Sequence, residues 1–411
     1  MISVNAKYWI WLTLALGYNT PKIKRICELY PDINDFYVSG EKEWRFCGIF
    51  SQNDIDKLKT KTLADAEKII SRCFELEYSV ICIDDAEYPQ CLFDIDTPPA
   101  LIYVKGNLPD IDNRLSIGIV GTRRATNYGV DNSYKFAYAL SKYGVTIVSG
   151  GALGVDCASH RGTLAADGVT ICVRGCGINC SYLRENAKMR DAIAKRGAVI
   201  SEYPPDETPR NYYFPARNRI ISALSNGILV IEAGVKSGSL ITASLAVEQG
   251  KEVFALLGNN SPQNEGSNNR IKEGSAIPVT DFMDILNNFD NLFATDEDVD
   301  LDKISLADIE AVPVKGYNPL IKQNKSHSVI DNKNNNIENK VEKQKNKEHK
   351  KDLNLSNTAQ LVYEYINNEP VHIDKISSDL NIPVFKVLTA ITMLEMKGLI
   401  QALQGRRYIL K

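Results

Sequence analysis

Three segments of this chain carry residue types that bind phosphate groups, and each follows a short apolar run. Residues 121–123 (Gly-Thr-Arg) and 149–154 (Ser-Gly-Gly-Ala-Leu-Gly) form glycine-rich turns, and residues 236–242 (Lys-Ser-Gly-Ser-Leu-Ile-Thr) add a lysine and hydroxyl groups. Glycine lets the backbone approach an anion, and a helix that begins after the turn offers unpaired N–H groups and the positive end of its dipole. The pattern predicts a phosphate-binding site where these turns meet.

An aromatic residue and two arginines lie close together in residues 214–219 (Phe-Pro-Ala-Arg-Asn-Arg). An aromatic face beside guanidinium groups suits a single-stranded base and its phosphate. Alternatively, Phe214 packs in the core and both arginines bind neighbouring loops, with at least one arginine facing inward. The candidate DNA- or phosphate-binding residues from all four segments are Gly121, Thr122, Arg123, Ser149, Gly150, Gly151, Gly154, Phe214, Arg217, Asn218, Arg219, Lys236, Ser237, Gly238 and Ser239.

Two other groups of residues could carry chemistry. Asp156 and His160 are four positions apart on an expected helix and face the same side. No Ser or Cys nucleophile lies beside them, which favours a capping and packing role over catalysis. Cys172, Cys176 and Cys180 could ligate a metal, but the first lies in an expected strand and the second in the loop after it. We expect no catalytic residue, no metal and no cofactor.

The elements that must position these residues follow from short apolar runs separated by helical patterns. Such alternation, with a helix expected at residues 130–143, predicts a parallel sheet covered by helices on both faces. Two further short strands, on either side of a Pro-Pro turn, lead into this sheet. The expected strands are residues 80–83, 100–104, 116–120, 145–148, 170–173, 198–200, 227–231 and 253–257.

Composition divides the chain into four regions. We expect a small helical domain, of the helix-hairpin-helix or SAM-like type, in residues 1–78 and an α/β core in residues 79–289. Residues 290–355 are rich in Asn, Lys, Glu and Asp, which predicts a disordered linker. Residues 356–411 regain a helical pattern and end in a short hairpin, as is typical of a winged-helix module.

The two terminal regions leave their roles open. Residues 48–51 are either half of a helix-hairpin-helix or a plain turn between packed helices, since no second glycine completes the hairpin. In the winged helix, the expected third helix at residues 383–397 carries few basic residues, so Arg406 and Arg407 are the better candidates for DNA contact. Partner binding is favoured over sequence-specific DNA reading.

The composition excludes several classes of protein. The 411 residues are 44% hydrophobic with a net charge of −3, which suits a sizeable core and not a uniformly basic coat for nucleic acid. No apolar run approaches the roughly 20 residues of a membrane span, so we expect no membrane association. The 9 cysteines, scattered through apolar segments, suit a reducing compartment, and we expect a cytoplasmic protein.

Taken together, these motifs resemble the DNA-processing protein A family (DprA, also called Smf). The resemblance covers roughly residues 88–277, and the order of many separate motifs makes it specific. The motifs are Tyr-Pro at residues 88–89, Val-Gly-Thr-Arg at 120–123, the turn at 149–154 with Asp156 and His160, Ser-Glu-Tyr-Pro-Pro at 201–205, Phe-Pro-Ala-Arg-Asn-Arg at 214–219, Glu-Ala at 232–233 and Lys-Ser-Gly-Ser at 236–239.

The resemblance implies a fold and a function. It implies an extended Rossmann-like core that forms a homodimer and binds single-stranded DNA in a basic pocket at the carboxyl ends of the strands. By the same resemblance, Arg123 and Lys236 hold phosphates and Phe214 stacks on a base. The implied role is a non-enzymatic mediator that protects incoming DNA and loads the RecA recombinase during natural transformation.

Departures and a rival function qualify this interpretation. The loop at residues 181–186 (Ser-Tyr-Leu-Arg-Glu-Asn) lacks the proline usual after its tyrosine, and Arg174 replaces an apolar residue. The alternative is a Rossmann-like nucleotide sensor or a nucleoside monophosphate phosphoribohydrolase. Such a hydrolase needs a carboxylate where this chain has Thr242, which counts against hydrolysis.

Overall fold

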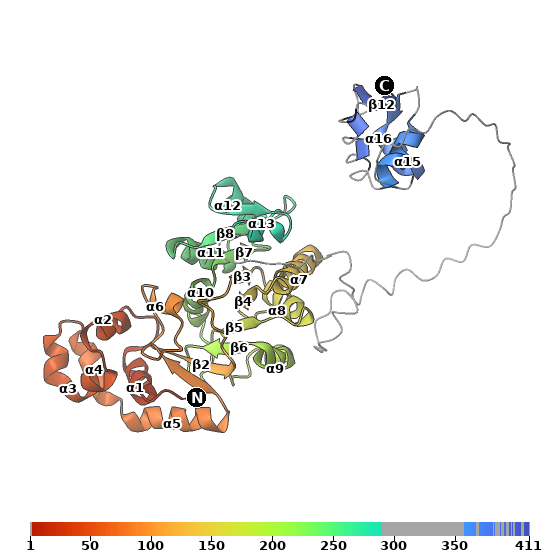
Figure 1. Cartoon of the computed structure of the whole chain (residues 1–411). Helices are drawn as coiled ribbons and strands as arrows, with labels where there is room; N and C mark the ends of the chain where they lie inside the picture. Colours follow the sequence, from red (N-terminus) through yellow and green to blue (C-terminus); the bar gives the residue numbers. More distant parts are fainter. Residues whose placement is uncertain are drawn as a thin grey trace. The chain divides into compact units, whose positions relative to one another are not determined.

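The computed structural model describes residues 2–289 and, with gaps, residues 357–410. The chain splits into two compact units, Met1–Val329 and Ile330–Lys411, and each is described by itself. The expected linker at residues 290–355 lies outside the described residues. In the first unit, helices near the N-terminus adjoin a large sheet (Figure 1).

The N-terminal region is helical, as predicted. Its core is aromatic: Trp11 packs against Phe36 and Trp44, with ring centroids 6.2 and 5.7 Å apart. Gly48 has φ 73° in the turn after the third helix, and Ser51 caps the next helix by a capping box with Asp54. The helices are α1 (Ala6–Leu16), α2 (Lys22–Leu29), α3 (Ile33–Phe46), α4 (Gln52–Thr60) and α5 (Leu63–Glu75).

A nine-stranded, mostly parallel sheet forms the centre of the first unit, which confirms the predicted α/β class. Its order is β1-β2-β6-β5-β4-β3-β7-β8-β9, and within it only the β1–β2 and β2–β6 pairings are antiparallel. The strands are β1 (Ser79–Cys82), β2 (Leu101–Gly106), β3 (Ser116–Val120), β4 (Thr146–Ser149), β5 (Thr170–Arg174), β6 (Ala198–Ser201), β7 (Gly227–Val230), β8 (Glu252–Leu256) and β9 (Ile277–Val279).

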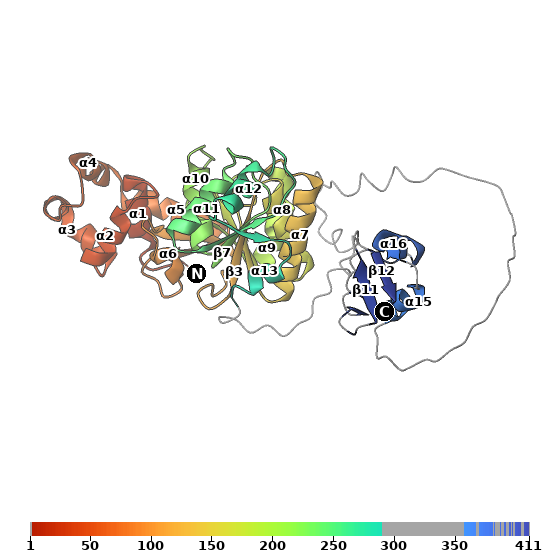
Figure 2. The same cartoon turned by 90° about the horizontal axis from the view of Figure 1, so that it is seen from above.

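Helices cover both faces of this sheet (Figure 2). Helices α7, α8 and α9 pack in sequence on one face, and α10 and α11 pack together on the other. The strands of the centre are buried along their whole length, which explains their continuous apolar runs. The helices are α6 (Gln90–Phe93), α7 (Asn127–Lys142), α8 (Val155–Ala165), α9 (Ala187–Arg196), α10 (Tyr213–Ala223), α11 (Ser239–Glu248), α12 (Glu265–Lys272) and α13 (Met283–Leu286), with a 3-10 turn at Arg184–Asn186.

The strand order reverses between β3 and β7. From β3, the chain adds strands β4, β5 and β6 on one side, and then returns to add β7, β8 and β9 on the other. In a parallel sheet of this kind, ligands bind in the crevice outside the carboxyl ends of the strands at such a reversal. The loops that follow β3, β4 and β7 meet at this edge.

The second unit has the elements of a winged helix. It contains a three-stranded antiparallel sheet of order β10-β12-β11 besides the described helices. The hydrophobic core of this unit includes Val362, Ile376 and Leu394. Most of the expected third helix, and Arg406, lie outside the described residues, whereas Arg407 begins the last strand. The elements are α15 (Asn357–Tyr365), β10 (Val371–His372), α16 (Ile373–Leu380), β11 (Ile400–Leu403) and β12 (Arg407–Leu410).

Across the described parts of both units, no helix has the length and apolar character needed to cross a bilayer.

Candidate nucleic-acid interface

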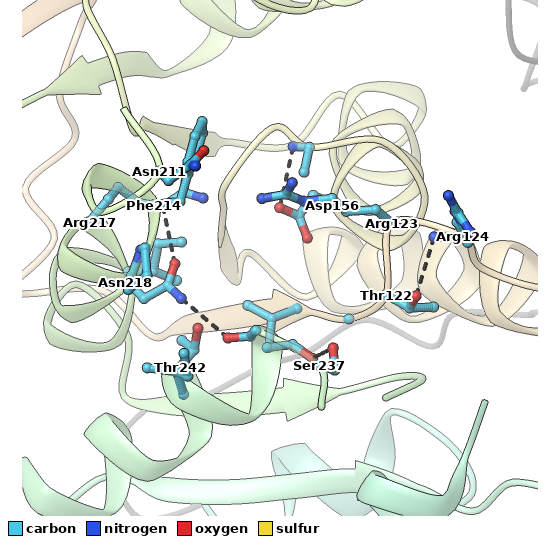
Figure 3. A pocket seen from close by; sticks show the side chains of 18 of the residues that line it. Thr122, Arg123, Arg124, Asp156, Asn211, Phe214, Arg217, Asn218, Ser237 and Thr242 are labelled. Atoms are coloured by element: carbon cyan, nitrogen blue, oxygen red, sulfur yellow. Dashed lines mark hydrogen bonds between the residues drawn. The ribbon is translucent and has the colours of Figure 1, made fainter. Parts of the chain in front are cut away.

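A pocket of about 620 Å³ opens at the carboxyl edge of the sheet, where its strand order reverses. Most of its wall comes from the first loop (residues 121–126, after β3), from helix α10, and from the end of the third loop (residues 231–238, after β7) together with the start of α11. Figure 3 shows Arg123 facing Phe214 and Arg217 across the hollow. The predicted residues that line it are Gly121, Thr122, Arg123, Phe214, Arg217, Asn218, Ser237, Gly238 and Ser239.

The first and third loops are tied together by one buried carboxylate. Glu232 accepts hydrogen bonds from the Thr126 backbone N–H (2.8 Å) and hydroxyl (2.7 Å). The Thr126 hydroxyl in turn caps the N-terminus of α7. The Thr122 N–H donates to the Glu232 carbonyl at 2.7 Å. Glu232 is thus committed to fixing the two loops and is not a free acid in the pocket.

Two arginines project from the first loop without a carboxylate partner. Arg123 and Arg124 are exposed, and the ion pairs of the described residues include neither. The guanidinium carbon of Arg123 lies 5.3 Å from the centre of the Phe214 ring. Arg124 also lines the pocket, although it was not among the predicted residues. These cations are available to an external anion because neither is held in an ion pair among the described residues, although the Asp156 charge acts on Arg123.

Phe214, in the first turn of α10, gives the pocket an aromatic wall. Its side chain is half-buried, and its ring centre lies 5.4 Å from that of Tyr182. The alternative interpretation required Phe214 to pack in the core, and its half-buried position does not fit this. Tyr182 and Asn211 line the pocket as well. Neither was predicted: Tyr182 belongs to the loop that departs from the family pattern, and nothing in the sequence singles out an exposed Asn211.

The second loop (residues 150–154, after β4) directs its polar groups at the chain's own side chains. The Asp156 carboxylate accepts a hydrogen bond from the Ala152 N–H at 3.3 Å, and a bond from the Gly150 backbone also stabilises its charge. Arg217 donates to the carbonyls of Gly150 (2.9 Å) and Val173. Burial raises the pKa of Asp156, and the Arg217 charge opposes this shift. An internal carboxylate therefore takes the place that we expected for a phosphate.

Two glycines of the motifs serve different purposes. Gly154 has φ +78°, and a Cβ there would lie 2.4 Å from the Thr122 carbonyl oxygen, so the first and second loops touch only because this residue is glycine. At Gly238 the backbone is helical, with φ −63°, and a Cβ would meet no protein atom within 4 Å. Gly238 instead leaves open space beside the pocket.

The structure does not bring Arg219 to the pocket. Its guanidinium is buried and pairs with the Glu202 carboxylate at 2.6 and 3.0 Å, and it also donates to the Thr97 carbonyl at 2.9 Å. Ser149 is also away from the pocket: it is buried and donates to the Ile119 carbonyl at 2.7 Å.

The remaining predicted residues lie near the pocket but do not line it. Lys236 is exposed on the third loop but is absent from the pocket lining, as is Gly154. Gly150 and Gly151 line a small inner extension of the pocket, beside Arg123, Phe214 and Arg217.

Asp156 and His160 do not form a catalytic pair. The His160 Nδ1 lies 2.8 Å from the Thr170 hydroxyl, which itself donates to the Ile147 carbonyl at 2.7 Å, so Nδ1 carries the proton. Burial lowers the pKa of His160 to about 3, with the Arg217 charge adding to the effect. His160 is a neutral, buried side chain under the second loop.

The cysteine spacing does not gather a metal site in the part of the chain that the structure describes. No group of three or more His, Cys, Asp or Glu side chains in those residues has the arrangement of a metal site. Cys172 lies within β5, and its thiol is directed at Gly151.

A family model described as DNA recombination-mediator protein A matches residues 79–290, slightly more than half of the chain. The chain belongs to this family. A second model, described as the DprA winged helix domain, matches residues 347–406. The resemblance inferred from the motifs is thereby confirmed.

Individual relatives agree with the family models. DNA processing protein DprA of Bacillus subtilis is 40% identical over 207 residues, which cover 50% of this chain and 68% of that protein. Protein Smf of Escherichia coli is 44% identical over 208 residues, which cover 50% of this chain and 55% of that protein. The structure of DprA from Streptococcus pneumoniae matches with a TM-score of 0.60 at 32% identity, covering 70% of this chain and 98% of that one.

Proposed function

We propose that the pocket binds single-stranded DNA, with phosphates on the first and third loops and a base against Phe214. One observation carries this proposal: Arg123, without a carboxylate partner among the described residues, lies over a half-buried aromatic ring in an open pocket. A base in a duplex is stacked and paired, whereas a single-stranded base is free to enter a pocket and stack on an aromatic side chain.

We further propose a mediator role without catalysis. In this proposal the protein protects incoming DNA in the cytoplasm during natural transformation and loads the RecA recombinase onto it. The family description as a recombination mediator and the names of the DNA processing relatives support this role. Against hydrolysis, Thr242 lines the pocket where a hydrolase needs a carboxylate, and Asp156 is bonded to the second loop.

We also propose that the core forms a homodimer. Exposed apolar side chains on and after α11 support an interface there: Val247 is 51% exposed and Leu257 is 46% exposed. Sedimentation of the full chain tests this step, and a monomer at micromolar concentration would contradict it.

Fluorescence anisotropy of a labelled single strand, measured over a salt series, tests the central proposal. We expect salt-sensitive binding that Arg123→Ala and Lys236→Ala weaken, because each removes a cation near the phosphates. Lys188→Ala serves as a control, since Lys188 is exposed on α9 and does not line the pocket. No binding, or equal binding by all variants, would contradict the pocket assignment; hydrolysis of a nucleoside monophosphate would favour the rival enzyme.

The mediator step needs its own test. We expect the wild-type chain to speed RecA assembly on a strand already coated by a single-strand-binding protein, and Arg123→Ala to lose this effect. RecA assembly that is unchanged by the wild-type chain would overturn the loading role and leave DNA binding intact.

A further inference from the structure

A second cavity, of about 270 Å³, opens beside helix α9 and shares no lining residue with the pocket proposed for DNA. Its wall comes from strands β2 and β6, from residues 178–184 in the loop after β5, and from the first turn of α9. The same loop supplies Tyr182 to the pocket proposed for DNA. The volume far exceeds what one water molecule needs, so the cavity has room for a phosphate group and part of an attached sugar.

The wall of this cavity contains a buried arginine without a carboxylate partner. Arg190 is 7% exposed, and its guanidinium Nη1 donates to the Leu183 carbonyl at 2.9 Å. The ion pairs of the described residues do not include Arg190, whereas the equally buried Arg219 pairs with Glu202. A buried charge costs free energy unless it is paired. The cavity therefore lacks a counter-ion that an external anion can supply.

Other charged groups in the wall leave this excess of positive charge in place. Arg184 is exposed, lines the cavity and takes part in no ion pair among the described residues. Lys105 also lines it, and its Nζ lies 2.6 Å from the carboxylate of Asp191. The Asp191 charge acts on Arg190 as well, but this carboxylate is already bonded to Lys105. Three cations thus face one carboxylate.

A second buried arginine adds to the positive charge. Arg174 donates to the carbonyls of Cys180 (3.2 Å) and Tyr182 (3.4 Å), and Arg190 bonds the next carbonyl along the chain, that of Leu183. The two guanidinium groups therefore hold neighbouring carbonyls of one loop. Burial lowers the pKa of Arg190, and the Arg174 charge lowers it further. A bound anion would relieve this repulsion.

The start of α9 leaves its own attraction for anions unsatisfied. Asn186 precedes the helix, but its side-chain amide donates to the Gly151 carbonyl at 3.3 Å and does not cap the helix. The first turn of α9 contains no acidic residue, and its first residue, Ala187, lines the cavity. The positive end of the helix dipole therefore adds to the effect of the arginines. The hydroxyl groups of Tyr78 and Ser181 are further donors in the wall.

We propose that this cavity is a second phosphate-binding site, in which Arg184 and Arg190 hold one phosphate group. Guanidinium groups present several N–H donors in a planar fork that matches the oxygen atoms of a phosphate. The phosphate belongs either to a nucleotide farther along a bound strand or to a free nucleotide or inorganic phosphate. Both sources offer the same chemistry to the two arginines, and separate experiments distinguish them.

Urea unfolding of the full-length chain in sodium phosphate, compared with sodium chloride of equal ionic strength, tests the site. An anion that binds the folded state stabilises it, and phosphate also stabilises folded proteins in general. The informative quantity is therefore the difference between variants. We expect Arg184→Ala to raise the apparent dissociation constant for phosphate about 10-fold. Arg184 is exposed, so its removal should leave the fold intact.

Lys188→Ala is the matched control, because Lys188 is exposed on α9 and does not line the cavity. It should respond to phosphate as the wild type does. Equal stabilisation of Arg184→Ala and Lys188→Ala by phosphate would overturn the proposal, as would a wild type that phosphate stabilises no more than chloride does.

The source of the phosphate has a separate readout, which rests on the proposed function. We would compare labelled single strands of about 4 and about 16 nucleotides, which span the site sizes of single-strand-binding folds. If the strand reaches the cavity, Arg184→Ala should weaken binding of the long strand about 3- to 10-fold and leave binding of the short strand unchanged. Equal binding of the long strand by Arg184→Ala and wild type would assign the site to free phosphate or nucleotide. A wild type that binds neither strand would contradict the proposed function and leave the phosphate experiment unaffected.

Discussion

The first and third loops differ from the second loop in where their polar groups point. All three follow parallel strands of one sheet, and all contain glycine. In the second loop, Asp156 and Arg217 bind the backbone from within the protein. The first loop instead carries Arg123 and Arg124, which are exposed and have no carboxylate partner among the described residues. One kind of sequence turn therefore serves two purposes, structure in one place and ligand binding in another.

The second and third loops differ in one residue at the start of the helix that follows, whereas the first loop owes its attraction for anions to its two arginines. Asp156 lies in the first turn of α8, where a carboxylate is stabilised by unpaired N–H groups and the helix dipole. Ser239 begins α11 with a neutral hydroxyl group, which bonds the Ser237 hydroxyl at 2.8 Å. A neutral helix start retains its attraction for an external anion, whereas a helix start that already has a carboxylate does not.

The largest expected effect is on stability and concerns the second loop. We expect Arg217→Met to lower the free energy of unfolding by about 3 kcal/mol, because two buried carbonyls lose a charged donor and Asp156 loses a nearby cation. Urea unfolding measures the change. Arg123→Ala is the matched arginine control and should leave stability nearly unchanged. Equal stability of Arg217→Met and wild type would show that the second loop is not held from within.

The next effect is on binding and concerns the first loop. We expect Arg123→Ala to weaken the binding of single-stranded DNA about 10- to 30-fold. The slope of log affinity against log salt concentration should become less steep by about 0.7, as for one lost phosphate contact on a single strand. Anisotropy at several salt concentrations measures both quantities. Arg219→Lys is a suitable contrast because Arg219 is paired with Glu202 away from the pocket. If Arg219→Lys weakened binding more than Arg123→Ala without loss of stability, the placement of the two arginines would be wrong.

These contrasts show how far the sequence leads. Continuous apolar runs in the sequence predict the buried parallel strands. Because parallel strands end at the same edge of a sheet, the sequence also predicts that the glycine turns lie along one edge. The sequence does not say that Arg219 pairs with Glu202, because this bond joins residues 17 positions apart across the fold. Nor does the sequence say that the Asp156 carboxylate accepts the hydrogen bond of the second loop at the Ala152 N–H. Both facts depend on side-chain direction, which the order of residues in a motif does not encode. Arg124, in contrast, directly follows Arg123 in the sequence, and this position is a signal that could have found it.

A smaller effect is the response of stability to acid, which again concerns the second loop. Burial lowers the pKa of His160 to about 3 in the folded state, so the unfolded chain binds the proton more readily. Stability is then full above the unfolded value of about 6.5 and falls as the pH is lowered toward 3. We expect a loss of about 1 kcal/mol between pH 6.5 and pH 5.5, measured by urea unfolding.

A variant isolates this histidine. His160→Asn keeps a side-chain N–H for the Thr170 hydroxyl but does not titrate, so its stability should change less over the same interval. An identical pH dependence in wild type and variant would assign the acid sensitivity to another group.

The smallest expected effect separates the two kinds of glycine. Gly238→Ala places a methyl group in open space on a helical backbone, so the fold should tolerate it. If single-stranded DNA passes over the third loop, the methyl group meets the DNA. The affinity for DNA should then fall about 3- to 5-fold, while the free energy of unfolding in urea stays as in wild type. Gly154→Ala is the opposite case, because its positive φ and the nearby Thr122 carbonyl oppose a side chain, and it should lose stability first. A Gly238→Ala variant that binds as tightly as wild type would place the strand away from the third loop and leave Arg123 and Phe214 as the main contacts.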